Sequence, residues 1–527
     1  MAALDPAVPV RRGPRWLSVE DPTWLQMGRR GSTLFIAIGC IAIVGWHALF
    51  LAEAQQLDPW YGATPGFRGT YINKMKRFFY FYHYTGKFPI TSSHSYLELQ
   101  EKPQAAQDLI TPRGFPNGLR NEDYAVIRKG DLGQIFLLYP DFWRSGRTLT
   151  ATPRTFNQGL AIVSSLVLFV GLSLAGHRLL AVFLVLLLGS HPFQLLHHYV
   201  LINVWAYPIA VASIALGISA PLLFGARPRR LHFLIPLVLG ILFATAYEVR
   251  TEPALLIASV ALVCLTARGN WKRRTLLVGT LAVSFLATSQ LWAHYWNVKF
   301  EDAIATVAAA GGRPLLSERN PHHSFWHPIW FGLGDFGTDK FYEAHDWAAY
   351  AYAIPKVNAI YGTNYKRASA RSYVLTNKDE TGYSLKPETI PEYQLVLREK
   401  VLTDIKNDPL WYLGILLKRT NRIFNQATPV RLGLGSRFID IPFSTWLVLA
   451  MLPCLLLVRR WEQLKLLIFY APTSLPALLI FSFGGFTNPT AFHLVAFALI
   501  SCWVVHAATG LVTNRTHQRA LKQLTAP

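Results

Sequence analysis

Charged residues are scarce in this chain of 527 residues: Asp, Glu, Lys and Arg make up 15% of the sequence, whereas hydrophobic residues make up 52%. Long uncharged runs recur along it, and soluble proteins rarely repeat such runs, which argues against a large soluble protein. Cysteine is scarce too, and all four cysteines lie within apolar runs: Cys40, Cys264, Cys454 and Cys502. We therefore expect neither disulfides nor a thiolate metal site.

The sequence also lacks internal repeats, low-complexity tracts and a clear small-residue cleavage site after its first apolar run. That run, TLFIAIGCIAIVGWHALFLA at 33–52, is longer than the apolar core of a signal peptide. We therefore interpret it as a retained membrane anchor.

Ten apolar segments are long enough to cross a membrane, because about 20 helical residues span the ~30 Å hydrocarbon layer. The third and fourth are interrupted by His191, His197, His198 and Pro208. We expect an all-α polytopic membrane protein with about ten transmembrane helices and two large mixed extracytoplasmic loops that carry interfacial helices. The expected spans are 33–52, 157–176, 179–197, 203–224, 231–249, 252–268, 275–296, 441–458, 466–485 and 491–513.

Basic residues mark one side of these spans. If the N-terminus lies inside, the short inside loops are rich in Lys and Arg, and the short outside loops hold only Arg250. We therefore expect a multi-pass protein of the plasma (inner) membrane with both termini cytoplasmic. The net charge of +21 reflects this orientation and an attraction to anionic lipid, so nucleic acid is not an expected partner.

The same topology predicts the domain organisation. Both long loops fall outside, and carriers usually keep their site near the bilayer midplane, so this polar mass favours an enzyme at the outer surface over a transporter. The expected parts are a cytoplasmic segment (1–32), a first transmembrane core (33–296) including an outer loop (53–156), an extracytoplasmic domain (297–440), C-terminal helices (441–513) and a cytoplasmic tail (514–527).

Two segments of the loops suit the membrane surface. The aromatic side chains of KRFFYFYHY (76–84) are typical of the membrane interface. The segment DPLWYLGILLKRTNRIF (408–424) predicts a helix in the interface plane with its basic residues toward headgroups. A short buried helix of the outer domain fits this second segment equally well.

The most highly charged short run in the first loop is NEDYAVIRKGD (121–131). It places two adjacent carboxylates within about two helical turns of Arg128 and Lys129. Adjacent carboxylates repel, which raises the pKa of one of them and suits a general base. A solvated loop without chemistry is the alternative interpretation.

This run resembles an element of the GT-C superfamily of integral-membrane glycosyltransferases, in the protein O-mannosyltransferase and aminoarabinose transferase branch. Three weaker similarities follow in the family's order: TPRTFNQGLAIVSSLVLFVG (152–171), VRTEPALLIAS (249–259) and VLTDIKNDPLWYLGILLKRTNRIF (401–424). No WWDxG-type motif is present, which argues against the oligosaccharyltransferase branch. The resemblance implies that a sugar passes from a polyprenyl-phosphate donor to a glycan, lipid or protein acceptor on the extracytoplasmic face, with inversion.

The resemblance also implies roles for individual residues. A carboxylate deprotonates the acceptor hydroxyl, and cationic side chains stabilise the departing phosphate. The implied catalytic residues are Asp123 and Glu122, with Glu53, Asp58 and Asp131 as alternative acids. The implied ligands of the donor phosphate are Arg128, Lys129 and Arg250. Arg250 has a second interpretation, pairing with its neighbours Glu248 and Glu252 at the membrane surface.

The stretch NPHHSFWHPIWFGLGDFGTDKFYEAHD (320–346) gathers histidines, aspartates and aromatic side chains. Its spacing matches no zinc motif, so a metal site stays open and no cofactor is firmly expected beyond a possible divalent ion. We expect His327, Trp326 and Trp330 to shape the substrate site, because aromatic faces stack on sugars.

Two other functions fit the composition. One is an O-antigen ligase-like or polymerase-like enzyme, which would move the chemistry to 297–440 with His327 and Arg313 as candidates. The other is a non-enzymatic transporter or a subunit of a membrane complex.

Overall fold

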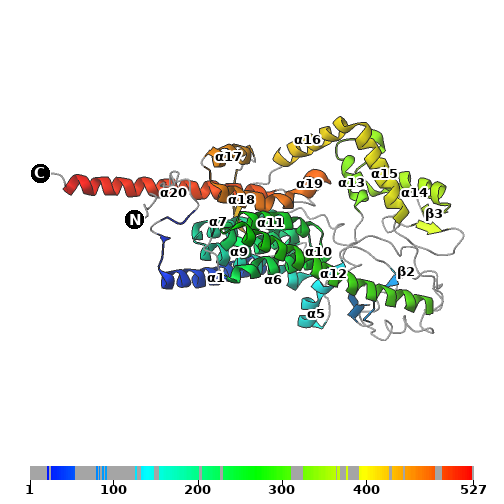
Figure 1. Ribbon diagram of the computed structural model, residues 1–527, viewed down its shortest axis with the longest axis horizontal. Helices are drawn as coiled ribbons and strands as arrows, with labels where there is room; N and C mark the ends of the chain where they lie inside the picture. Colours follow the sequence, from blue (N-terminus) through cyan, green and yellow to red (C-terminus); the bar gives the residue numbers. More distant parts are fainter. Residues whose placement is uncertain are drawn as a thin grey trace, which may run out of the picture.

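The computed structural model describes residues 20–22, 25–53, 79–80, 82–83, 86–87, 90–91, 125–126, 132–146, 153–200, 204–225, 230–309, 325–363, 365–367, 375–377, 391–425, 430–442, 446–457, 459–480 and 490–524. An elongated helix bundle forms its centre, and a smaller helical domain lies beyond one end (Figure 1). The C-terminal helix leaves the bundle at the opposite end (Figure 1).

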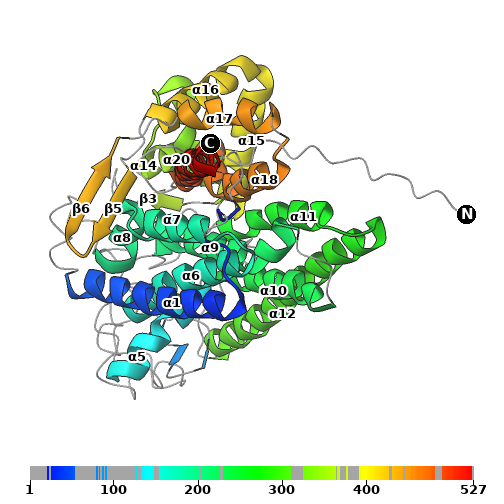
Figure 2. The same ribbon diagram turned by 90° about the vertical axis from the view of Figure 1, so that its left-hand side faces the viewer.

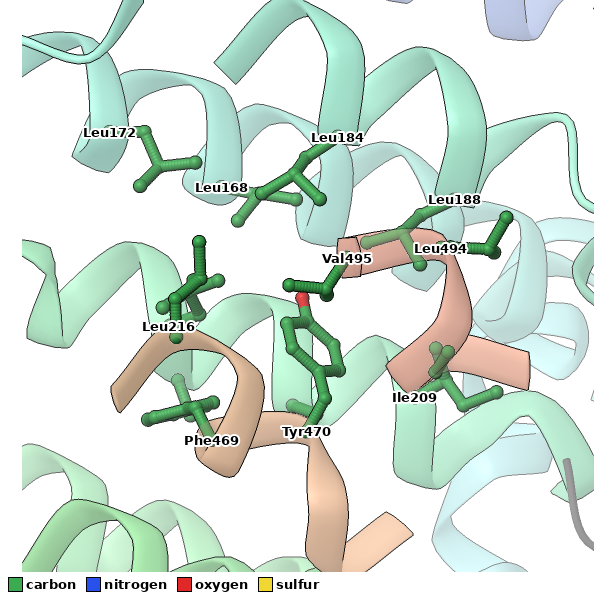
Figure 3. Packing of buried hydrophobic residues seen from close by; sticks show 14 of the residues in the cluster. Leu168, Leu172, Leu184, Leu188, Ile209, Leu216, Phe469, Tyr470, Leu494 and Val495 are labelled. Carbon is green, nitrogen blue, oxygen red and sulfur yellow. The ribbon is translucent and has the colours of Figure 1, made fainter. Parts of the chain in front are cut away.

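The bundle is built from the apolar runs of the sequence. Lipid offers no hydrogen-bond partners, so an apolar segment in a membrane satisfies its backbone N–H and C=O groups internally by forming a helix. Buried hydrophobic side chains from helices throughout the bundle pack into one core, and Figure 3 shows Leu168, Leu184 and Tyr470 within it. The bundle helices are α1 (Arg29–Ala52), α6 (Arg154–Leu174), α7 (Arg178–Gly189), α8 (Pro192–Leu195), α9 (Tyr207–Leu223), α10 (Leu234–Val249), α11 (Leu256–Thr266), α12 (Trp271–Ala309), α17 (Trp446–Leu457), α18 (Trp461–Tyr470), α19 (Leu475–Leu479) and α20 (Thr490–Leu524).

Short 3₁₀ and π turns join several of these helices. They are η8 (Leu196–Val200), η9 (Val204–Ala206), η10 (Arg230–Phe233), η11 (Glu252–Leu255) and η14 (Ala471–Ser474). The η8 segment is a single π turn, a form that is rare and frequently found at functional sites.

The expectation of an all-α membrane protein is confirmed in its coarse form. Within the described residues six helices are long and apolar enough to cross a membrane: Arg29–Ala52, Arg154–Leu174, Val204–Leu223, Leu231–Val249, Trp271–Ala303 and Ala491–Val512. A seventh span results if Arg178–Gly189 and Pro192–Tyr199, which are bent by 58°, count as one. The other expected spans correspond to shorter apolar helices, Glu252–Thr266 and Trp446–Leu457, and to α18, which has 10 residues. Ten full-length spans are therefore not found among the residues that the structure describes.

Proline explains part of this difference. Pro192 follows the break after α7, and Pro472 and Pro476 lie in the short elements η14 and α19 after α18. Proline removes a helix hydrogen bond and clashes with the preceding turn, so it favours short or broken helices.

Helices α6 and α9 approach each other closely through glycine. A Cβ atom on Gly171 would lie 2.0 Å from the carbonyl oxygen of Gly217, and one on Gly217 would lie 2.3 Å from that of Val167. Small residues of this kind let membrane helices pack backbone against backbone. Larger residues at these two positions would push α6 and α9 apart.

The smaller domain comprises residues 325–425 and has its own core. Its elements are α13 (Trp326–Leu333), η12 (Asp339–Phe341), α14 (Asp346–Tyr361), β3 (Tyr365–Arg367), β4 (Leu375–Asn377), α15 (Pro391–Asn407) and α16 (Pro409–Asn425). Strands β3 and β4 pair antiparallel, with Tyr365 opposite Asn377. Arg419 of α16 joins this domain to the bundle by donating to the Leu478 carbonyl of α19 over 3.1 Å.

The remaining elements lie at the same end of the bundle. They are β1 (Ile90–Thr91), β2 (Ala125–Val126), η7 (Leu132–Leu138), α5 (Tyr139–Ser145), β5 (Val430–Leu434) and β6 (Arg437–Ile441). Strands β1 and β2 pair antiparallel, and β5 and β6 form an antiparallel hairpin. We call this end, where α1, α7 and α10 end and where the 325–425 domain lies, the polar end.

Asp141 connects α5 to the start of α6. Its carboxylate accepts hydrogen bonds from the backbone N–H groups of Arg154 and Thr155, over 2.7 and 3.0 Å. These groups belong to the first turn of α6, where backbone N–H groups have no partner within the helix and carry partial positive charge. At the opposite end, Arg178 plays a comparable part by pairing with the buried Asp21 over 2.9 Å.

Candidate functional site

The predicted site residues fall into two groups. Six of them lie outside the described residues: Glu122, Asp123, Arg128, Lys129, Asp131 and Asp58. The other five lie within the described residues: Arg250, Glu53, His327, Trp326 and Trp330.

Arg250 lies at the polar end, at the corner between α10 and η11. Helix α10 ends at Val249, and Arg250 takes an extended conformation before η11 begins at Glu252. Its Nε donates to both carboxylate oxygens of Glu252, over 3.1 and 3.0 Å, and its Nη2 also contacts Glu252. The two side chains are 19% and 14% exposed. This fork of hydrogen bonds fixes the guanidinium plane.

Glu248, the other acid of this corner, contacts α12. Its Oε2 atom accepts a hydrogen bond of 2.7 Å from the indole Nε1 of Trp296 on α12. The Arg250–Glu252 ion pair and the hydrogen bond from Trp296 to Glu248 both help to hold this corner.

The segment η7 is fastened to the same corner. The side-chain amide of Gln134 donates to the Val249 carbonyl over 2.9 Å. A Cβ atom at Gly133 would lie 2.8 Å from the backbone carbonyl group of Glu248, so only glycine allows this approach. Because η7 begins at Leu132, the chain directly after the charged run 121–131 is anchored beside Arg250. Strand β2, within that run, packs against α12.

Glu53 lies elsewhere at the polar end, at the C-terminus of α1. Its Oε2 atom accepts a hydrogen bond from the backbone N–H of Ser436, in the turn of the β5–β6 hairpin. Hydrogen bonds from the Ser436 side chain and backbone hold the pKa of Glu53 below its usual range, with a smaller contribution from the nearby charge of Arg437. Glu53 is therefore an anion at neutral pH.

Two further hydrogen bonds hold the same hairpin against the bundle. The indole of Trp46 donates to the Gly433 carbonyl over 2.8 Å, and the hydroxyl of Ser190 donates to the Arg431 carbonyl over 2.7 Å. Figure 2 shows the hairpin beside α7 and α8. Arg431 also pairs with Asp440 over 2.7 and 2.9 Å, and these hydrogen bonds hold the pKa of Asp440 below its usual range.

Below the hairpin the bundle encloses a small polar cavity. His47 bridges two side chains there: Nδ1 lies 2.6 Å from the Tyr199 hydroxyl, and Nε2 lies 2.9 Å from the Ser165 hydroxyl. Nearby, His198 Nε2 lies 2.7 Å from the amide oxygen of Gln194. The cavity leaves ≈ 20 Å³ for the centres of water-sized molecules, room for one or two waters. Every polar group along it is uncharged or a histidine, which suits hydroxyl groups or water rather than phosphate.

This cavity is the feature that the sequence interpretation missed. A signal was present, because polar and ionisable side chains within apolar spans are costly and often functional. His47 lies within the first expected span. His198 lies between the third and fourth expected spans, where a histidine also signals an interruption of the apolar run.

The 325–425 domain holds the predicted substrate-shaping residues. His327 Nδ1 lies 2.6 Å from the Tyr393 hydroxyl and Nε2 lies 3.1 Å from the Asp346 carboxylate, so both ring nitrogens have partners. Trp330 is fully buried, with its ring centre 4.5 Å from that of Tyr342. His327 and Trp330 therefore pack in the domain core, and their role in shaping a substrate site stays a prediction.

Trp326 begins α13, and its backbone N–H donates to Gln394 over 3.3 Å. Its ring is partly buried and packs against the same core. Within the described parts of the chain, no three His, Cys, Asp or Glu side chains gather as a group that could hold a metal ion.

Comparisons of the chain with protein-family models, with curated proteins and with solved structures found no match. The similarity to the GT-C superfamily therefore stays a hypothesis carried by the motifs themselves.

Proposed function

We propose that the chain is a membrane glycosyltransferase that moves a sugar from a polyprenyl-phosphate donor to an acceptor hydroxyl at the polar end of the bundle. One observation carries the proposal. The described residues on either side of 127–131 contact the α10–α12 pair, through β2 on one side and Gly133 and Gln134 on the other. The corner of this pair carries Arg250. These contacts support a common location for the two segments to which the GT-C resemblance assigns acid and phosphate ligand.

The chemistry needs three groups in that region. A carboxylate accepts the proton of the acceptor hydroxyl as its oxygen attacks the anomeric carbon of the donor. The bond between that carbon and the phosphate oxygen breaks, and its electron pair leaves with the polyprenyl phosphate. A cation stabilises the phosphate charge, and the opposite-face attack inverts the anomeric centre.

Arg250 is the proposed phosphate ligand. Glu252 binds one edge of its guanidinium group and so orients the group without exposing it fully. Arginine suits the role because its planar fork matches two phosphate oxygens at once. Glu252 is then a positioning residue, and its removal should weaken phosphate binding less than removal of Arg250.

Two acids compete for the role of base. Asp123, with Glu122 beside it, belongs to the run that precedes Gly133, whereas Glu53 ends the first span. Glu53 is already engaged by Ser436, and its lowered pKa makes it a weaker base than a free carboxylate. This geometry favours Asp123, with Arg128 and Lys129 as further ligands of the phosphate.

The membrane setting follows from the basic inside loops. We propose that the polar end faces the extracytoplasmic side of the plasma membrane and that both termini are cytoplasmic. A cysteine introduced at exposed Trp143 (76% exposed) should then react with an impermeant maleimide in intact cells, and labelling only after lysis would reverse the orientation.

The function is tested with full-length protein reconstituted in liposomes and supplied with a panel of polyprenyl-phosphate monosaccharides. Donor turnover and binding of radiolabelled polyprenyl phosphate are measured for Asp123→Asn, Glu53→Gln and Arg250→Ala. Asp302→Asn is the control, because Asp302 pairs with Lys87 over 2.8 Å at the surface. We expect Asp123→Asn to bind donor without turning it over, Arg250→Ala to lose binding, and the control to match the unchanged protein.

The outcomes separate the function from the site. Turnover of no polyprenyl-phosphate sugar, with no binding of polyprenyl phosphate, rejects the function. A requirement for a pyrophosphate-linked oligosaccharide selects the ligase-like or polymerase-like alternative. Turnover that survives in Asp123→Asn and is lost in Glu53→Gln keeps the function and moves the base to Glu53.

A further inference from the structure

A strained turn in the 325–425 domain carries an exposed aromatic side chain. Lys340 and Phe341 both have positive φ, 57° and 71°, in the left-handed region that side-chain-bearing residues avoid. Consecutive residues of this kind are unusual, and such strain persists only where the surroundings hold it in place. Phe341 is 78% exposed, so the strain does not serve to bury its ring.

The surroundings clamp this turn firmly. Lys340 Nζ lies 3.0 Å from Asp408 Oδ2 and 4.6 Å from the centre of the Trp411 ring. On the other side of the turn, Tyr342 is fully buried and its hydroxyl donates to Asp404 over 2.9 Å. Both anchors lie at the junction of α15 and α16. The turn is thus fixed so that Phe341 stands beside the start of α16.

Helix α16 continues this apolar feature. Leu410, Leu413 and Leu417 are 77%, 49% and 62% exposed. Their spacing of three and four residues places them on one face of the helix. The buried residues of α16 are Ile415 and Arg419, on a different face. An uncovered apolar line therefore runs from Phe341 along α16, and we call these four exposed residues the apolar line.

The far end of α16 joins the lipid-facing surface of the bundle. Arg419 donates to the Leu478 carbonyl, and the ring of Phe424 stacks on Trp446 with centres 5.1 Å apart. Trp446 starts the apolar helix α17 and is 50% exposed, and Leu447 after it is 44% exposed. Figure 1 shows α16 between α17 and α15, along the edge of the molecule. The apolar line thus leads to exposed apolar side chains of α17, an apolar helix suited to contact with lipid.

We propose that the apolar line is seated in the interfacial layer of the bilayer that holds the bundle, and that it anchors the 325–425 domain to the membrane surface. Phospholipid is the occupant because the line leads into the lipid-facing side of α17. Exposed Lys418 lies next to Leu417 and suits anionic headgroups. The inference is independent of the proposed function.

The test uses full-length protein in nanodiscs that contain phosphatidylglycerol. Phe341→Cys and Leu413→Cys are made in a Cys454→Ser background, because Cys454 is the exposed cysteine among the four, and are labelled with an environment-sensitive nitrobenzoxadiazole dye. Ile360→Cys is the matched control: Ile360 is 60% exposed, but α14 lies on the side of the domain away from the bundle (Figure 1).

We expect the dye at 341 and 413 to emit at shorter wavelength than at 360 and to be quenched by doxyl-labelled phospholipid. The dye at 360 should be quenched by aqueous iodide instead. Equal iodide quenching at all three positions, without quenching by doxyl lipid, overturns the proposal. Protection from both quenchers also overturns it, because it means that a protein surface covers the line.

Unmodified protein gives a second measurement that needs no substitution. Nanodiscs that contain a photoactivatable phospholipid are irradiated, and the adducts are located by peptide mass spectrometry. Adducts on 409–417 and none on 346–361 support the membrane seat. Adducts on 446–457 without any on 409–417 refute it, since α17 then contacts lipid and α16 does not.

Discussion

Gly133→Ala tests the contact on which the proposed function depends. A Cβ atom at this position would lie 2.8 Å from the carbonyl carbon and oxygen of Glu248, whereas ordinary contact begins at 3.4 Å. The two backbones must therefore separate by the difference, about 0.6 Å. The neighbouring bond from Gln134 to Val249, 2.9 Å long, opposes the separation. The change thus displaces η7 from the corner that carries Arg250.

Two effects of different size are expected. Overpacking of one methyl group in a tight contact costs roughly 1–3 kcal/mol in the free energy of unfolding. A displacement of up to about 1 Å between catalytic groups costs up to ~100-fold in rate. We therefore expect donor turnover to fall by roughly 10- to 100-fold in protein that is still folded. Turnover per folded molecule is measured in liposomes, and folding is followed by thermal unfolding in detergent.

Gly159→Ala is the matched control, because a Cβ atom at this position of α6 meets no atom within 4 Å. Alanine favours the helix over glycine, so stability should rise by about 0.5–1 kcal/mol without any change in turnover. Full turnover in folded Gly133→Ala would refute the reasoning. So would a loss that matches the unfolded fraction, because the position of η7 would then have no bearing on the reaction.

Three further predictions concern packing and charge. Asp335→Ala leaves the fully buried Arg419 guanidinium without its carboxylate, so thermal unfolding should show a loss of about 3–5 kcal/mol, and a loss under 1 kcal/mol would contradict this. The pKa of Glu53 is lowered on folding, so its contribution is complete above the ordinary value of 4.5 and is lost as the pH falls through the folded value; the amide protection of Ser436 should follow that fall and become insensitive to pH in Glu53→Gln. Gly217→Val forces a side chain against the α6 backbone, 2.3 Å away at Cβ, so size-exclusion chromatography should recover little folded protein, and normal recovery would show that α6 and α9 can separate.

Hydropathy predicts the helices of the bundle well, because a helix in lipid needs apolar residues along its whole length. The first span, expected at 33–52, is α1 at Arg29–Ala52. Shorter elements are harder to predict. One example is the bend at His191 and Pro192 between α7 and α8, which hydropathy does not reveal. A count of apolar runs measures apolar content, and it does not measure the length of an unbroken helix.

Most features of the site that the sequence does not predict depend on contacts between residues far apart in the chain. His47 meets Tyr199 and Ser165, which are 152 and 118 positions away in the sequence. The contacts of Arg250 could not be predicted from the sequence either, although its candidate partners are only two residues away. Pairing with its acidic neighbours is one of two interpretations of the sequence, and it is the extended backbone after Val249 that brings its guanidinium group onto Glu252.

The topology brings Glu53, Arg250 and the start of η7, which directly follows the run 121–131, to one end of the bundle. Helices α1 and α10 both end there, so Glu53 and Arg250 share that end, and the anchoring of η7 brings the chain after Asp131 to the same place. The bonding of each acid separates them further. Protonation of Glu53 would weaken the hydrogen bonds that its carboxylate accepts from Ser436, so loosening of the hairpin turn would accompany proton transfer if Glu53 is the base. A cross-link that fixes the hairpin to α1 should therefore slow the reaction if Glu53 is the base and leave it unchanged if the base is Asp123.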